Sequence, residues 1–192
     1  MEEANRRGTL RAMLGMTLGM AATGGCDNVE LDRLHRLLLD HYAANIAVLS
    51  RPFPGAMAAL DELTAMGVKV AIVTNKFEHL AVRLLNDIGI ADRFACIIGG
   101  DTMGKGLSKP HRAPIDAMIE RCGGGRAAFV GDSIYDTGAA RNAGIPSVAV
   151  SFGFLMQPIA ELGADAVIDR YEDLIPALRT LGEGWRAGPV PR

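Results

Sequence analysis

Hydrophobic residues follow a helical period in the first part of the chain. Between residues 28 and 50, apolar side chains recur every three or four positions, which places them on one face of a helix. Asp27 or Asn28 can cap the start of this helix, and we expect it to run to about Ser50. Its apolar positions are Leu31, Leu34, Leu38, Tyr42 and Ile46.

From Gly55 onward, short apolar runs alternate with amphipathic segments. The runs predict buried β-strands and the segments between them predict helices. This alternation is typical of a parallel sheet with helices on both faces, so we expect an α/β fold with a doubly wound parallel sheet. The predicted strands are Val68–Val73, Phe94–Ile98, Ala127–Val130, Ser147–Val150 and Ala166–Ile168, and the predicted helices are Ala56–Met66, Phe77–Ile88, Pro114–Cys122, Tyr135–Ala143, Pro158–Leu162 and Glu172–Leu181.

A stiff connector separates these two patterns. Arg51-Pro52-Phe53-Pro54-Gly55 places two prolines around an aromatic residue, which favours an extended backbone and ends a helix. We therefore expect a helical unit over residues 1–50, an α/β core over residues 51–181 and a loose tail over residues 182–192.

Polar residues follow several of the predicted strands. Thr74-Asn75-Lys76 and Gly99-Gly100-Asp101 each follow a strand, and Lys109 lies in the next loop. Asp132 follows a later strand, with Asp136 four residues further on. Because the carboxyl ends of parallel strands share one edge of a sheet, we expect these residues to lie together.

Their residue types favour phosphate and metal chemistry. Thr74 and the N–H groups after it can donate to phosphate oxygens, helped by the start of the following helix. Lys109 offers a positive charge for phosphoryl transfer. Asp132 and Asp136 offer the oxygen ligands that Mg²⁺ requires. Each residue also has a structural interpretation: an aspartate after a strand often caps a helix, Thr74 can be a cap, and Lys109 a surface charge.

Composition narrows the classes of function. The chain has 192 residues and a net charge of −2, which gives no indication of a nucleic-acid or membrane partner. Three scattered cysteines fit free thiols in a reducing compartment. Arg6-Arg7 followed by Leu10 to Ala22 imitates an export signal, but Arg11 interrupts its apolar core. We expect a cytoplasmic protein.

From Arg51 to about Leu181 the chain resembles the haloacid dehalogenase superfamily of phosphatases, in particular its phosphoglycolate phosphatase-like branch. Residues 1–50 resemble the latter part of the helical cap of that branch, so the resemblance implies a Rossmannoid core with a partial cap. The matching motifs are Pro54-Gly55, Val73 to Lys76, Ser108-Lys109-Pro110, Val130 to Ser133 with Asp136, Ala139-Ala140, Ala143-Gly144 and Ser151 to Phe154.

The resemblance implies a Mg²⁺-dependent phosphatase that acts on a small phosphorylated metabolite. In this family Thr74 would bind the transferred phosphoryl group, with Asn75 beside it at the substrate. Lys109 would steady the phosphate and the nucleophile. Asp132 would ligate Mg²⁺, with Asp136 next to it. Phosphoglycolate is the expected substrate, and other phosphomonoesters or pyrophosphate stay open, as does the oligomeric state.

One family motif is missing. The family begins with a strand that ends in Asp-x-Asp-Gly-Thr, whose first aspartate is the nucleophile, and this chain contains no Asp-x-Asp. Gly8-Thr9-Leu10 imitates only the end of the motif. We expect a truncated phosphatase whose sheet lacks a strand between the runs 68–73 and 127–130. The alternative is a non-catalytic remnant that binds phosphate or a partner.

Three other classes fit less well. Gly99 to Gly106 is close to a phosphate-binding loop, but the Ser or Thr that would bind Mg²⁺ is absent. A dinucleotide-binding fold would need G-x-G-x-x-G after a strand, which the sequence does not have. A signalling receiver domain would place its acidic pair before the Thr and Lys, whereas here Thr74 and Lys109 come first.

Overall fold

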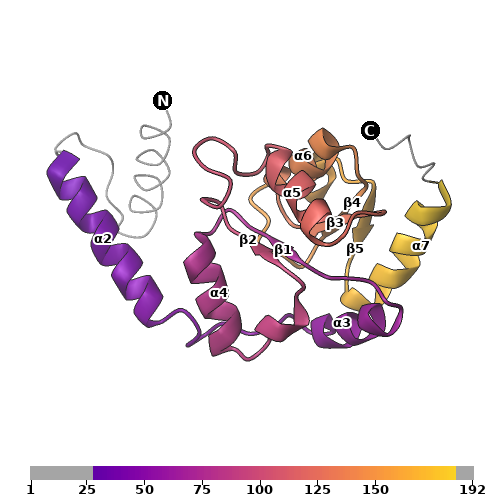
Figure 1. Ribbon diagram of the computed structural model, residues 1–192, viewed down its shortest axis with the longest axis horizontal. Helices are drawn as coiled ribbons and strands as arrows, with labels where there is room; N and C mark the ends of the chain where they lie inside the picture. Colours follow the sequence, from indigo (N-terminus) through magenta and orange to yellow (C-terminus); the bar gives the residue numbers. More distant parts are fainter. Residues whose placement is uncertain (1–27, 185–192) are drawn as a thin grey trace. The chain divides into compact units, whose positions relative to one another are not determined.

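The structure is a computed structural model that describes residues 28–184 (Figure 1). The signal-like segment Leu10 to Ala22, the Gly8-Thr9-Leu10 motif and residues 185–192 of the predicted tail lie outside the described residues. The chain divides into two compact units, Met1–Leu49 and Ser50–Arg192.

In the first unit the described residues form helix α2 (Asn28–Ala44). This helix ends several residues before the predicted end at Ser50, and the side-chain amide of Asn45 donates to the carbonyl of His41 at 2.9 Å at that end. Leu34 and Leu38 are half-buried and Ile46 is 3% exposed. The predicted apolar face is therefore only partly buried, since Tyr42 on the same face is exposed.

The second unit alternates strands and helices, as the sequence predicted. Its described strands all pair in parallel. They are β1 (Ile72–Val73), β2 (Ile97–Ile98), β3 (Phe129–Gly131), β4 (Ser147–Val150) and β5 (Ala166–Ile168). The α-helices are α3 (Ala56–Ala65), α4 (Glu78–Asp87), α5 (Ala113–Arg121), α6 (Ile134–Ala143) and α7 (Leu174–Gly184), with 3₁₀ turns at Ala91–Arg93, Ile159–Leu162 and Tyr171–Asp173.

Some boundaries differ from the prediction. Only the last two residues of the apolar runs 68–73 and 94–98 form the strands β1 and β2. The segment that follows Pro158 forms a 3₁₀ turn in place of a helix, because four residues are too few to establish an α-helical hydrogen-bond pattern. The last helix begins at Leu174, after a 3₁₀ turn.

Strand β4 lies at the centre of the second unit, and all four of its residues are buried. Helix α6 packs on β3 and β4, whereas α7 packs on β4 and β5. Figure 1 shows these two helices on opposite sides of the strands. This arrangement confirms the predicted α/β fold with helices on both faces of a parallel sheet. The core on the α7 side consists of Ala59, Leu63, Val148, Val150, Ile168, Leu174 and Ile175.

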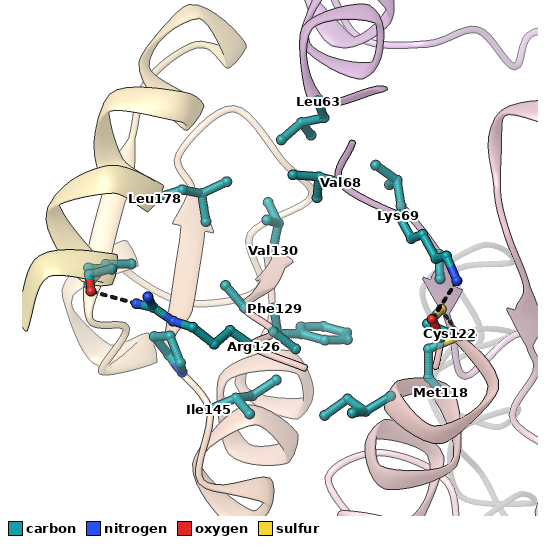
Figure 2. A pocket seen from close by; sticks show the side chains of 18 of the residues that line it. Leu63, Val68, Lys69, Met118, Cys122, Arg126, Phe129, Val130, Ile145 and Leu178 are labelled. Carbon is teal, nitrogen blue, oxygen red and sulfur yellow. Dashed lines mark hydrogen bonds between the residues drawn. The ribbon is translucent and has the colours of Figure 1, made fainter. Parts of the chain in front are cut away.

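The strands form two separate sheets, β1-β2 and β3-β4-β5. Strands β1 and β3 do not pair, and a cavity of about 860 Å³ lies between them. Figure 2 shows that its lining is mostly apolar, with Leu63, Val68, Met118 and Val130 among the side chains around it. The gap lies where the sequence predicted that a strand is missing.

The backbone along both sides of the cavity is suited to pairing with a strand. The N–H groups of Ile72 and Thr74 donate to the carbonyls of Cys96 and Ile98 at 3.0 and 2.9 Å, so the N–H groups of the alternate residues Ala71 and Val73 point toward the cavity. On the other side the N–H of Phe129 donates to the carbonyl of Pro146, so the backbone of Val130 points toward the cavity.

Two basic side chains lie at the end of the cavity where strands β1 and β3 begin. Lys69 Nζ donates to the carbonyl of Cys122 at 2.7 Å, and Arg126 Nη2 donates to that of Gly182 at 2.5 Å. Both cations are therefore held by helix ends beside the cavity. Figure 2 shows these two side chains on opposite sides of the opening.

We predict that the 192-residue chain expressed alone aggregates. Each buried backbone group without a partner costs about 1–3 kcal/mol, and several of them approach the roughly 5–15 kcal/mol that stabilise a typical domain. An N-terminal extension that carries one apolar strand should fill the cavity. Size-exclusion chromatography and thermal unfolding of both chains test this expectation.

The matched control is the same extension with proline at two adjacent positions in the strand, since proline cannot donate to a sheet. This control should aggregate like the 192-residue chain. A monomeric 192-residue chain that unfolds cooperatively, at the same temperature with or without the extension, would show that the cavity does not limit stability.

Candidate active site

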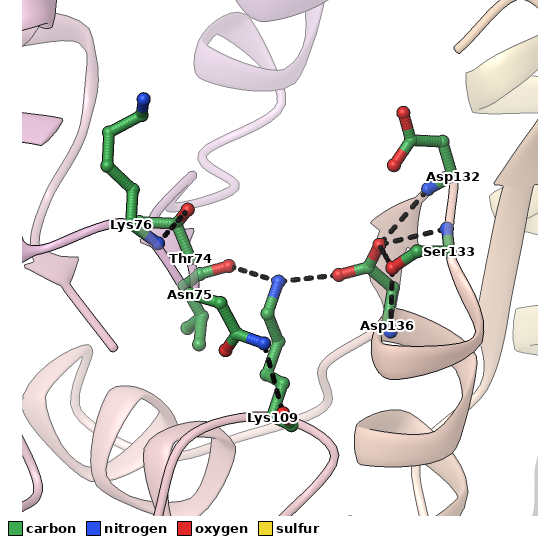
Figure 3. A network of polar contacts seen from close by, with 8 residues as sticks. Thr74, Asn75, Lys76, Lys109, Asp132, Ser133 and Asp136 are labelled. Atoms are coloured by element: carbon green, nitrogen blue, oxygen red, sulfur yellow. Dashed lines mark hydrogen bonds and ion pairs between the residues drawn. The ribbon is translucent and has the colours of Figure 1, made fainter. Parts of the chain in front are cut away.

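The structure brings the predicted site residues together at the carboxyl ends of β1 and β3 (Figure 3). Thr74 directly follows β1, and Asp132 directly follows β3. Asp136 lies in the first turn of α6. Lys109 reaches this edge from the loop before α5 and lies between the two strand ends. The predicted neighbourhood of a hydroxyl, a lysine and two carboxylates is thus present.

The side chain of Lys109 connects the two sheets. Its Nζ donates to the carbonyl of Val73 at 2.8 Å and to Asp136 Oδ1 at 2.5 Å. It also lies over the ring of Phe129, 5.1 Å from the ring centre. The side chains of Lys109 and Asp136 are only 9% and 8% exposed, so this ion pair is largely shielded from water. Lys109 is therefore a fixed positive charge and not a surface lysine.

Asp136 accepts hydrogen bonds on both of its carboxylate oxygens. Oδ1 faces Lys109, and Oδ2 accepts from the Ser133 hydroxyl at 2.6 Å and from the N–H groups of Asp132 and Ser133 at 3.2 and 3.1 Å. Ser133 and Asp136 form a capping box at the start of α6. The sequence allowed Asp132 to be the helix cap, but in the structure Ser133 and Asp136 cap α6.

Asp132 has a different environment. Its Oδ2 accepts the N–H of Phe154 at 2.7 Å. Its Oδ1 has no hydrogen-bond partner within the described residues. The side chain is half-buried at the edge of the site. Of the two predicted metal ligands, Asp132 is the one that keeps an oxygen available.

Thr74 and Asn75 are held by local contacts. The hydroxyl oxygen of Thr74 accepts the N–H of Lys76 at 3.2 Å, which leaves its O–H free to donate. Asn75 Nδ2 donates to the carbonyl of Lys109 at 3.0 Å, so this amide ties β1 to the lysine loop. Figure 3 shows the Lys76 side chain pointing away from Lys109 and Asp136.

The start of the following helix differs from the expectation. The N–H of Glu78, the first residue of α4, donates to Asp101 Oδ1 at 2.8 Å, and the Glu78 carboxylate contacts the hydroxyl of Thr102. The loop after β2 therefore caps α4. That N–H is not available to a phosphate group, a contact that sequence spacing could not reveal because the two residues are far apart in the chain.

Sequence analysis missed a cluster of packed aromatic rings beside Asp132. Phe152 packs edge-on against Phe53 at 5.5 Å and against Tyr171 at 5.1 Å between ring centres. Phe154 lies 6.0 Å from Phe53 and is 83% exposed. The motif Ser151 to Phe154 was the available signal, but the sequence alone gave it no role.

The side chains at the site supply only some of the oxygen ligands that a hard cation needs. No group of three or more His, Cys, Asp or Glu side chains that could hold a metal exists within the described residues. Asp132 nevertheless offers a carboxylate oxygen, which is the ligand type that Mg²⁺ prefers. The residues present therefore fit one direct protein ligand, with Asp136 committed to Lys109 and the α6 cap.

Comparisons with known proteins assign the family. Residues 17–144 match the model of the haloacid dehalogenase-like hydrolases. Two relatives, both named phosphoglycolate phosphatase, come from Agrobacterium fabrum and Caulobacter vibrioides. The first is 44% identical over 151 residues, which cover 78% of this chain and 64% of that protein. The second is 38% identical over 166 residues, which cover 85% and 69%.

The fold comparison agrees. A crystal structure of a predicted phosphoglycolate phosphatase from Haemophilus somnus superposes with a TM-score of 0.74 and 29% identity, over 80% of this chain and 68% of that one. The chain belongs to the haloacid dehalogenase-like hydrolase family, as its motifs indicated. It spans about two thirds of the length of the curated relatives that it matches.

The phenol of Tyr171 reports on the charge of Asp132. Burial raises the pKa of Tyr171, and the nearby negative charge of Asp132 raises it further. We predict that Asp132→Asn lowers the pKa of Tyr171 only part of the way, because burial is the larger cause. Near-ultraviolet absorbance of the phenolate against pH measures the shift, with Tyr171→Phe to assign the signal.

The same shift has a consequence for stability. The folded chain keeps the Tyr171 proton above about pH 10, where the unfolded chain loses it, so the free energy of unfolding falls as pH rises through that range. Tyr171→Phe should remove this contribution.

The pKa prediction for Asp132→Asn has its own contradicting outcome. An unchanged pKa of Tyr171 in Asp132→Asn would mean that Asp132 does not lie near the phenol.

Proposed function

We propose that this chain is the core of a Mg²⁺-dependent phosphatase that acts on a small phosphomonoester, with 2-phosphoglycolate as the substrate. The observation that carries the proposal is that the shielded Lys109 charge and the available oxygen of Asp132 lie at the same sheet edge. The family and the phosphoglycolate phosphatases among its relatives support the same reaction class.

The residues take separate roles in this proposal. The free O–H of Thr74 donates to an oxygen of the phosphoryl group, and Lys109 offsets the negative charge of that group and of the nucleophile. Asp136 keeps Lys109 in place. Asp132 is the direct ligand of Mg²⁺, and Asp136 stays beside it through the capping box. The cation, when bound, supplies charge that stabilises the phosphoryl oxygens.

The nucleophile has to come from outside this set of residues. By resemblance it is an aspartate at the end of a strand, and the cavity between β1 and β3 leads to the site where such a strand would end. Its carboxylate would attack phosphorus as the ester oxygen leaves with a proton from the second carboxyl group of the motif. Water would then give a proton to that carboxylate and cleave the aspartyl phosphate, which releases phosphate and frees the nucleophile. The proposal therefore includes a strand in the cavity that ends in Asp-x-Asp.

We further propose a cytoplasmic protein whose partner is a small phosphorylated metabolite and neither nucleic acid nor a membrane. Cys96 and Cys122 are both free thiols, which suits a reducing compartment. The described part of the chain has no helix that is long and apolar enough to cross a bilayer.

A phosphate-binding protein without turnover is the second candidate. The absence of Asp-x-Asp from the 192 residues favours it. The two candidates separate in one assay of the chain extended by a strand that ends in Asp-x-Asp. Phosphate release from 2-phosphoglycolate supports the phosphatase, whereas phosphate binding with no release from this substrate or an aryl phosphate supports the second candidate.

We predict that Lys109→Ala lowers the turnover of the extended chain by on the order of 10²-fold, because a buried donor to the transferring group is lost. The control is Lys105→Ala in the same loop, which removes an exposed lysine and should change turnover by less than about twofold. Phosphate release gives both rates, and circular dichroism checks that both variants fold. Equal losses in the two variants would contradict the role of Lys109.

We predict that Asp132→Asn abolishes Mg²⁺-dependent turnover of the extended chain, because the amide cannot supply the anionic oxygen that the cation needs. Asp116→Asn is the control, since Asp116 lies on α5 and pairs with the exposed Arg112. Phosphate release is followed while Mg²⁺ is raised to saturation. Near-normal turnover of Asp132→Asn at saturating Mg²⁺ would show that another residue holds the cation.

A further inference from the structure

The loop after β4 is fixed to its surroundings before it reaches Asp132. The N–H of Ser151 donates to the carbonyl of Ile168 at 3.0 Å, and its hydroxyl donates to Asp169 Oδ1 at 2.5 Å. The ring of Phe152 then lies between Phe53 and Tyr171. This loop, residues 151–154, therefore has little freedom to move away from β3.

Gly153 lies directly against Asp132. A Cβ atom on Gly153 would lie 2.3 Å from Cβ of Asp132 and 2.6 Å from its Oδ2, closer than unbonded atoms can approach. The backbone of Gly153 does not have a positive φ, so conformation alone would permit other residues. Space beside the Asp132 carboxylate is what requires glycine here.

The next residue fixes the direction of that carboxylate. The N–H of Phe154 donates to Asp132 Oδ2 at 2.7 Å, which turns this oxygen toward the loop and leaves Oδ1 for another partner. A free aspartate would sample several rotamers. A hydrogen bond from an anchored backbone group selects one of them, which lowers the cost of ordering the ligand when a cation binds.

We propose that Gly153 and the backbone N–H of Phe154 position Asp132 as a cation ligand, so that the loop 151–154 belongs to the cation site. The proposal rests on the proposed function, because it assumes that Asp132 binds the cation. Gly153 and Phe154 are positioning residues, since they act on the cation through Asp132. Removing such a contact typically weakens metal binding about 10–100-fold.

The test measures Mn²⁺ binding to the 192-residue chain with the strand extension, because the chain alone is expected to aggregate. The electron paramagnetic resonance signal of the free ion gives the affinity. Gly153→Ala should weaken Mn²⁺ binding about 10–100-fold. In the extended chain it should raise the Mg²⁺ concentration needed for half-maximal turnover more than it lowers turnover at saturating Mg²⁺. Gly182→Ala is the matched control, since its added methyl would meet only the end of the Arg126 side chain, at 3.3 Å.

Two further variants keep the test decisive. Ser151→Ala loosens the loop without adding an atom, so it should weaken Mn²⁺ binding severalfold even if Gly153→Ala does not fold. Met156→Ala removes an exposed side chain just after the loop and should bind Mn²⁺ like the unchanged extended chain.

The outcomes separate the two proposals. If Asp132→Asn loses Mn²⁺ binding while Gly153→Ala and Ser151→Ala keep it, the positioning role is wrong and the cation role of Asp132 stands. If Asp132→Asn in the extended chain binds Mn²⁺ as tightly as the unchanged extended chain, or if the unchanged extended chain folds but does not bind Mn²⁺, both the cation role and the positioning role are wrong.

Discussion

The ion pair between Lys109 and Asp136 is the interaction on which the site depends. It joins the end of β1, through the carbonyl of Val73, to the start of α6. No ladder of backbone hydrogen bonds joins β1 to β3, so this side chain connects two sheets that do not otherwise pair. Breaking a buried pair by removing one partner costs about 3–5 kcal/mol, because the other charge is left uncompensated. The same contact that holds the sheets together therefore fixes the charge to which the proposed function assigns phosphoryl transfer.

Glycine allows the loops at this edge of the sheet to pack closely. A Cβ on Gly131 would lie 2.4 Å from Cγ of Asp136, and one on Gly100 would lie 2.4 Å from the carbonyl oxygen of Asn75. Gly153 lies in the same way against Asp132. The loops at the strand ends thus approach one another through backbone and leave the polar side chains between them. A single methyl group at any of these positions would force a neighbouring carboxylate or loop to move.

Much of this arrangement could be predicted from sequence. The apolar runs located the strands, and the rule that parallel strands end at one edge brought Thr74, Lys109, Asp132 and Asp136 together correctly. The missing family motif predicted the gap between β1 and β3. These inferences succeed because each depends on local pattern and on a topology that few residues can change.

The remaining details depend on contacts between residues that are distant in the chain. Asp101 caps α4 from the loop after β2, and Phe154 bonds to Asp132 from the loop after β4. Periodicity carries no information about such pairs. The sequence also did not show that the two aspartates differ. The carboxylate of Asp136 accepts hydrogen bonds from the α6 turn and from Lys109, whereas Asp132 keeps one oxygen available. Sequence spacing treats the two carboxylates alike, whereas their hydrogen-bond partners make them different.

The division of the sheet also bears on how the molecule assembles. Strand β1 finds its partner in β2, and β3 and β4 each pair with the next strand along the chain, so every described ladder closes within a short stretch of sequence. Each sheet is therefore built from strands that are close together in the chain, whereas the edge that carries Thr74, Lys109 and Asp132 lies where the two sheets meet. A substitution that shifts one sheet relative to the other should change the distances among these residues, even when the substituted residue lies far from them.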